Sequence, residues 1–227
     1  MEIGKLPNNL LREIVIDKIK NRRDEVLLSP RIGEDCSALD LGDKICILSS
    51  DPITGAEKKI GNLAVNVSCN DLAACGAEPV GLMVTILVPP LATRESLEEI
   101  MEQLCSEANK LNVDIIGGHT EVTDAVNRYV ISTTCIGKTS RGRLISSGGA
   151  KPGDSFVLTK LAGMEGTAII AHDMENELKT FMNEKSITEA RTYMDRISVL
   201  KEGLLAADEG AGAMHDVTEG GVLGAVW

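Results

Sequence analysis

The sequence has very few aromatic residues: two Phe, two Tyr and one Trp among 227 residues. Its core must therefore be built from aliphatic residues and Met, and it offers few aromatic platforms on which single-stranded nucleic acid could stack. The formal net charge of −11 also repels phosphate backbones. We expect no nucleic-acid partner. An acidic chain can still bind a nucleotide when divalent cations bridge its carboxylates to the phosphates.

Several signals of cellular location are also missing. The first residues, MEIGKLPNNLLREIVIDKI, lack the basic start and long apolar run of a signal peptide. No stretch approaches the ~18 uninterrupted apolar residues of a membrane span. None of the six cysteines forms a C-x-x-C pair, which favours reduced, buried thiols over a disulfide framework or a zinc site. These features predict a cytoplasmic protein with no membrane partner.

Hydrophobic periodicity predicts alternating helices and strands. The expected helices lie at 10–19, 61–76, 96–111, 166–174 and 195–208. The expected strands lie at 36–42, 44–50, 80–88, 113–118, 128–137 and 156–160, with a further strand, turn and helix in GAMHDVTEGGVLGAVW. The clearest helix is 96–111, where Ser96 and Glu99 fit a capping box.

The segment TSRGRLISSGGAKPGDS interrupts this pattern and is rich in Gly, Ser and basic residues. Such composition is typical of a domain boundary, so we expect one domain at 1–149 and a second at 150–227. The chain stops at Trp227 within an apolar helix. The second domain is therefore expected to be incomplete, or to be completed by a partner.

Acidic residues recur at the ends of apolar elements. They are Glu34-Asp35, Asp51 after ICILSS, Asp71 within CNDLAACGAEP, and Glu121 after IIGGHT. Carboxylates at strand ends face the crevice where α/β proteins bind ligands, and Mg²⁺ prefers such oxygens together with water and phosphates. A single Asp in a turn or at a helix start also serves as a structural cap. The pattern alone leaves both interpretations open.

Neither common nucleotide fingerprint, G-x-x-x-x-G-K-[ST] or G-x-G-x-x-G, occurs. Gly117-Gly118 forms a tight turn on the ordinary interpretation, whereas TEGG at 218–221 could direct backbone N–H groups at a phosphate. His119 and His215 have no visible catalytic partners, so a structural role stays open beside a catalytic one.

Taken in order, six stretches resemble one superfamily, which contains aminoimidazole ribonucleotide (AIR) synthetase, thiamine-monophosphate kinase, selenophosphate synthetase and hydrogenase-maturation protein E. They are GEDCSALDLG, SSDPIT, IGNLAVNVSCNDLAACGAEPVGLMVTILVP, DIIGGHTEV, KPGDSFVLTKLAGMEGTAIIA and MHDVTEGGVLGAVW. Within the superfamily, LAGMEGTAIIA and MHDVTEGG are most similar to hydrogenase-maturation protein E and its AIR-synthase-related relatives.

The resemblance implies a PurM-like α+β (α/β) architecture of two domains, with ATP and Mg²⁺ bound in the cleft. The family's N-terminal sheets join two copies into a barrel-like homodimer, so a homodimer is implied here. The shared chemistry is activation of an oxygen by phosphoryl transfer from ATP, on a small-molecule substrate or on a partner protein's C-terminal group.

Site residues follow by matching positions. The implied metal ligands are Asp35, Asp51, Asp71 and Glu121. The implied cofactor-binding residues are Gly33, Gly117, Gly118, Thr120, Asp216, Thr218, Gly220 and Gly221. Catalysis is placed on Asp71, supported by Asn70, with His119 as a further candidate.

One position departs from the family pattern. Relatives commonly have Gly-Asp-Thr or Gly-Glu-Thr after the Gly-Gly strand end, whereas this chain has Gly118-His119-Thr120-Glu121. Two alternatives therefore stand beside a hydrogenase-maturation protein E-like enzyme. One is a small-molecule kinase of the thiamine-monophosphate type, and the other is a nucleotide-binding scaffold without catalysis.

Overall fold

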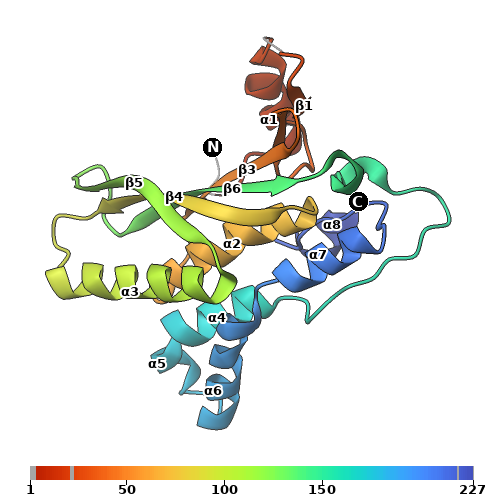
Figure 1. Cartoon of the computed structure of the whole chain (residues 1–227). Helices are drawn as coiled ribbons and strands as arrows, with labels where there is room; N and C mark the ends of the chain where they lie inside the picture. Colours follow the sequence, from red (N-terminus) through yellow and green to blue (C-terminus); the bar gives the residue numbers. More distant parts are fainter. Residues whose placement is uncertain (1–3, 21–22, 219, 227) are drawn as a thin grey trace.

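The computed structural model describes residues 4–20, 23–218 and 220–226 (Figure 1). The strands are β1 (Val26–Leu28), β2 (Ser37–Asp40), β3 (Ile45–Ile53), β4 (Glu78–Val88), β5 (Asp114–Val122) and β6 (Val130–Thr139). The α-helices are α1 (Asn8–Ile14), α2 (Ile60–Ala74), α3 (Arg94–Leu111), α4 (Met164–Asp173), α5 (Glu175–Leu178), α6 (Glu184–Thr192), α7 (Leu200–Asp208) and α8 (Gly221–Val226).

The strands form one mixed sheet in the order β1-β2-β3-β6-β4-β5. Every pair is antiparallel except β4 and β5, which are parallel and are joined by the crossover helix α3. The expected α+β fold is confirmed. The sheet of the single chain is open, with β1 and β5 at its edges, so closure by a second copy stays a prediction.

The register of the sheet defines two faces. Asp51, Thr133, Val84 and Gly118 lie in one row across β3, β6, β4 and β5. Thr133 and Val84 are buried, so this row faces the core beneath the sheet. Because side chains alternate along a strand, the neighbouring row that contains His119 faces the opposite side.

Helix α2 fills the space beneath the sheet and packs against α3 and α7 (Figure 1). Fourteen of its fifteen residues are buried. Small residues allow the close approach: a Cβ at Gly61 would lie 2.8 Å from the Ile100 carbonyl oxygen, and one at Gly203 would lie 2.6 Å from the Ala73 carbonyl oxygen. A helix buried on all sides holds its polar residues in fixed positions, which matters for Asn70 and Asp71.

Some expected elements differ in the structure. Helix α3 begins at Arg94, because Thr93 and Ser96 form the capping box that the sequence placed at Ser96 and Glu99. The expected strand at 156–160 and the one before the TEGG turn are absent among the described residues. Phe156 and Val157 are instead largely exposed, with no described strand beside them to satisfy their backbone groups.

The cysteine prediction holds for most thiols. All six are free, and Cys36, Cys69, Cys75 and Cys135 are buried, whereas Cys46 is half-buried and Cys105 exposed. Contact with Cys75, together with burial, raises the pKa of the Cys36 thiol, which keeps it protonated and unreactive. Among the described residues, no helix is long and apolar enough to cross a membrane.

Candidate functional site

Four aspartates from four segments meet at one end of α2. Asp35 lies in the loop before β2, Asp51 near the end of β3, Asp71 near the C-terminal end of α2, and Asp216 in the segment before α8. Asp71 and Asp216 are 7% and 9% exposed. Asp35 and Asp216 also form, with His215, a group whose ligand atoms lie within 4.8 Å of one another. The fold therefore brings these four aspartates, which lie far apart in the sequence, together; we call them the acidic cluster.

Ser49 joins two of these carboxylates. Its hydroxyl lies 3.1 Å from Asp51 Oδ2 and also contacts Asp71 Oδ2. A hydroxyl has one proton, so it donates to only one carboxylate at a time. A proton held on Asp71 accounts for both contacts, because Asp71 then donates to Ser49 while Ser49 donates to Asp51.

The electrostatics of the cluster favour that proton. Burial, followed by the nearby charge of Asp216 and contact with Asp51, raises the pKa of Asp71 to about 10. Burial and the charge of Asp35 raise the pKa of Asp216 to about 6. Carboxylates that destabilise one another in this way are stabilised by a shared cation.

His215 contacts two carboxylates of the cluster. Its Nδ1 atom lies 2.8 Å from Asp35 Oδ2 and 3.9 Å from Asp216 Oδ1. The hydrogen bond with Asp35 raises the pKa of His215. One imidazolium cannot balance four carboxylates, so the cluster keeps an excess of negative charge when all four are ionised.

The donor set fits a magnesium ion. Mg²⁺ requires hard oxygen ligands and keeps several water or phosphate ligands beside one or two protein carboxylates. Asp35, Asp51, Asp71 and Asp216 supply such oxygens at a site that is only partly open to solvent. A divalent cation would offset the repulsion that, after burial, raises the pKa of Asp71 and Asp216.

Asn70 lies beside Asp71, and both ends of its amide bind backbone. Its Nδ2 donates to the Ile197 carbonyl at 3.1 Å, and its Oδ1 accepts from the Val199 N–H at 2.8 Å. Lys160 binds the same segment through the carbonyls of Arg196 and Ser198. Asn70 thus joins the helix that carries Asp71 to the segment before α7, and its expected support of the helix site stays a prediction.

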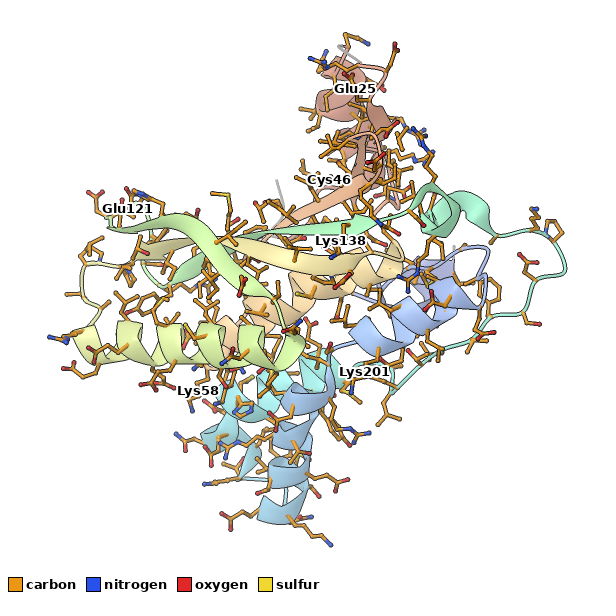
Figure 2. All side chains as sticks on the ribbon, viewed as in Figure 1. Glu25, Cys46, Lys58, Glu121, Lys138 and Lys201 are labelled. Atoms are coloured by element: carbon orange, nitrogen blue, oxygen red, sulfur yellow. The ribbon has the colours of Figure 1, made fainter. Side chains whose placement is uncertain are left out.

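The predicted residues of β5 lie away from the aspartates. Gly118 is in the row of Asp51 but three strand spacings distant, which is ~14 Å. His119 and Glu121 point to the opposite face, where they contact each other at 3.1 Å and are largely exposed. Figure 2 shows Glu121 at the far end of β5 from α7 and α8.

The remaining predicted glycines lie in turns. Gly33, Gly220 and Gly221 have positive φ angles of 80°, 87° and 60°, which L-residues with side chains rarely adopt. The Gly221 N–H donates to the Thr218 carbonyl at 3.2 Å, which closes the turn after Asp216. Glu219 of the TEGG motif and the terminal Trp227 lie outside the described residues.

Two residues of the cluster were not assigned from the sequence. Ser49 lies two residues before Asp51, and the period-two alternation of a strand could have placed both on one face. The sequence leaves a structural or a catalytic role open for His215, but its partner Asp35 lies 180 residues earlier, and no local pattern connects the two.

Comparison with known proteins agrees with the fold. The family model of the AIR synthase related protein N-terminal domain matches residues 33–139, and that of its C-terminal domain matches residues 151–226. The two matches together cover most of the chain and contain all four aspartates. The protein therefore belongs to the AIR synthase related protein family, as its sequence motifs indicated.

Particular relatives share its sequence or its fold. A protein of Methanocaldococcus jannaschii named for hydrogenase expression and formation is 28% identical over 98% of this chain and 66% of its own length. Carbamoyl dehydratase HypE of Cupriavidus necator is 30% identical over 72% of this chain and 45% of its own. The chain thus spans less than two thirds of either relative. The solved structure of AaThiL complexed with AMPPCP and TMP shares the fold, with 17% identity, a TM-score of 0.75, and coverage of 96% of this chain and 69% of that one.

Proposed function

We propose that this protein binds ATP with Mg²⁺ and transfers a phosphoryl group to an oxygen of its substrate. The convergence of Asp35, Asp51, Asp71 and Asp216 on one partly buried site carries the proposal. Such a cluster has little use without cations, because its members repel one another. Phosphoryl transfer needs positioning and charge neutralisation, and it needs no protein nucleophile.

Each part of the chain has a defined task in this proposal. Asp35, Asp51 and Asp71 hold the metal, and Ser49 fixes the separation of the last two through its hydroxyl. Bound Mg²⁺ would neutralise the phosphate oxygens of ATP. Helix α2 is buried, and Asn70 binds it by two hydrogen bonds to the segment before α7. Asp71 would therefore keep its position when the nucleotide binds.

The glycines would contact the nucleotide through their backbone N–H groups, since they have no side chain. We propose that the turn formed by Thr218, Gly220 and Gly221 faces the phosphates, since it follows directly on Asp216. Gly33 does the same beside Asp35. Gly117, Gly118 and Thr120 would then contact the nucleotide at a point remote from the metal, because β5 lies ~14 Å away across the sheet.

The substrate belongs to one of two chemical classes. They are a C-terminal group of a partner protein and a free small molecule. The name of the relative carbamoyl dehydratase HypE supports the oxygen of a carbamoyl group as the phosphoryl acceptor. The buried thiols of this chain are not candidates for an acceptor, because the pKa of Cys36 and of Cys135 is raised and both are shielded from solvent.

We further propose that a second copy covers the open face of the sheet. Met83 and Ile116 are 46% and 56% exposed there, and Leu48 and Ile136 lie beside them half-buried. Figure 1 shows α2 and α3 on the other side of the sheet. An exposed apolar patch on a sheet is typical of a protein interface.

The test measures binding and turnover separately. Binding of an ATP analogue to the purified protein is followed by calorimetry with and without Mg²⁺. Formation of ADP is followed with ATP alone and with thiamine monophosphate or C-terminal peptides added. Mg²⁺-dependent binding with substrate-stimulated turnover supports the proposal. Tight binding with no turnover under any condition supports a non-catalytic scaffold, and no binding overturns both.

A further inference from the structure

A short segment between the two halves of the chain contacts three of the regions that carry the acidic cluster. Residues 145–149, which we call the boundary segment, lie between the parts matched by the two family models, 33–139 and 151–226. The boundary segment contributes no carboxylate of its own. It contacts Glu34, Cys75 and Gly212, and each of these residues lies within four positions of an aspartate of the cluster.

The first of these contacts is made by a buried carboxylate. The side chain of Glu34 is 2% exposed, and Asp35 is the next residue in the chain. Its Oε2 accepts from Ser146 Oγ at 3.1 Å and from Arg31 Nε at 2.9 Å, and its Oε1 accepts from the Ser147 N–H at 3.4 Å. A carboxylate is tolerated inside a protein only when it is paired and hydrogen-bonded. These bonds therefore hold the backbone that carries Asp35 against the boundary segment.

The other two contacts are made by backbone. The Ile145 N–H donates to the Cys75 carbonyl at 3.2 Å, at the C-terminal end of α2. Gly149 lies so close to Gly212 that a Cβ at Gly149 would overlap the Gly212 carbonyl oxygen. The φ angle of Gly149 is not positive, so the close contact, and not the backbone conformation, requires glycine there. The boundary segment thus fixes the chain three residues before His215.

Asp35 and His215 are therefore held from one short segment, the first through Glu34 and the second through Gly149. We propose that the boundary segment positions Asp35 against His215, and that Glu34 and Gly149 are positioning residues for the acidic cluster. Binding sites depend on such supporting contacts, because a side chain binds well only when its own backbone is held in place. The inference rests on the proposed function only in the use made of the cluster, since these contacts form without a nucleotide.

The ordinary alternative is that residues 145–149 only link the two halves of the chain. A linker rich in Gly and Ser needs neither a buried carboxylate beside it nor a glycine at a close backbone contact. The two roles differ in one observable, which is whether a substitution at Glu34 or Gly149 changes the environment of the His215 ring.

The experiment records the ring resonances of His215 by ¹⁵N NMR of the metal-free protein at one pH, with His215→Gln to assign them. Asp35→Asn supplies the reference spectrum of an imidazole that has lost its carboxylate partner. We expect Gly149→Ala and Glu34→Gln each to move the His215 resonances toward this reference. Each should also weaken the binding of a Mg²⁺–ATP analogue, measured by calorimetry, by about tenfold.

Each variant has a matched control. Gly142→Ala corresponds to Gly149→Ala, because a Cβ at Gly142 would meet nothing within 4 Å. Glu98→Gln corresponds to Glu34→Gln, because Glu98 also pairs with an arginine but lies exposed on α3. Both controls should keep the wild-type His215 resonances and change the affinity for the analogue by less than about twofold.

Unchanged His215 resonances in either folded variant overturn the inference, even if the melting temperature falls, because a mere linker would give that result. If Gly149→Ala does not fold, Glu34→Gln alone decides. Resonances that move while the affinity for the analogue stays at the wild-type value would also overturn it, since the cluster would then not depend on this positioning. Resonances that move in a protein that binds no Mg²⁺–ATP analogue would instead overturn the proposed function and leave the positioning of Asp35 against His215 standing.

Discussion

The imidazole of His215 lies 2.8 Å from the carboxylate of Asp35, although 180 residues separate them in the chain. Asp35 falls in the segment matched by the family's N-terminal domain, and His215 in the segment matched by its C-terminal domain. The acidic cluster is therefore built from both halves of the chain. Its integrity depends on their packing as much as on any single carboxylate.

Asp71→Asn should weaken Mg²⁺–ATP binding without lowering the thermal stability of the protein. Loss of one metal carboxylate is expected to weaken Mg²⁺–ATP binding by ~1–3 kcal/mol, which is about 5- to 150-fold. Thermal stability of the metal-free protein near pH 7 should stay level, because a buried carboxyl group that holds a proton is replaced by a neutral amide. Calorimetry and thermal unfolding measure the two. Asp124→Asn, in the exposed turn after β5, is the control. A lower melting temperature with unchanged binding would show Asp71 to be a structural brace.

The same carboxyl group predicts how stability depends on pH without metal. Its pKa is about 10 in the folded protein and near 4 when unfolded, so between these values the folded state binds more protons. The free energy of unfolding should therefore fall as pH rises through this window. Asp71→Asn should flatten the fall, and saturating Mg²⁺ should reduce it. Urea unfolding in EDTA at pH 5, 7 and 9 measures the effect, and equal slopes in wild type and variant would contradict it.

Asn70 should prove a stability determinant as well as a neighbour of the site. In Asn70→Ala the Ile197 carbonyl and the Val199 N–H both lose their partner, which should cost ~1–3 kcal/mol and lower the melting temperature by about 2–10 °C. Asn127→Ala, in an exposed turn, should change the melting temperature by less than about 1 °C. A fall in turnover at unchanged stability would instead support the catalytic role expected from the sequence.

The sequence predicts much of the scaffold because its patterns are local. The apolar stripe of α3, the small residues of α2 and the alternation in β3, β4 and β6 each follow from neighbours in the chain. The strand expected at 156–160 did not form, because an apolar run needs a partner strand as well as a pattern.

A site residue can be predicted from the sequence only where its own helix or strand directs its side chain toward the core. Asp51 and Asp71 do so, whereas the Asp35–His215 contact depends on how distant segments meet. Glu121 illustrates the opposite case. The sequence ends its strand at Gly118, but β5 continues to Val122, so Glu121 stays within the strand and alternation directs it to the other face.

Glu121→Gln should therefore have little effect on metal binding. Its carboxylate lies on the face opposite to Asp51 and pairs with His119, so Mg²⁺ affinity should stay within about twofold of wild type. Calorimetry in parallel with Asp51→Asn, which should lose at least about tenfold, provides the comparison. A comparable loss in both variants would place Glu121 at the metal, as the sequence pattern suggested.

The open face of the sheet gives the last prediction. Met83 is 46% exposed on that face, in the row of Ser50 and Thr134, and the apolar side chains of Leu48, Ile116 and Ile136 lie near it. If a second copy covers this face, Met83→Glu places a charge in a buried interface at a cost of several kcal/mol.

We expect wild type to sediment as a dimer and Met83→Glu as a monomer at the same concentration. The monomer should keep its circular dichroism spectrum, because the substituted side chain points away from the core. Leu91→Glu, at a residue that is 96% exposed in the turn before α3, adds the same charge elsewhere and should remain a dimer. A monomeric wild type, or a dimer that tolerates Met83→Glu, would mean that a second copy does not cover this face.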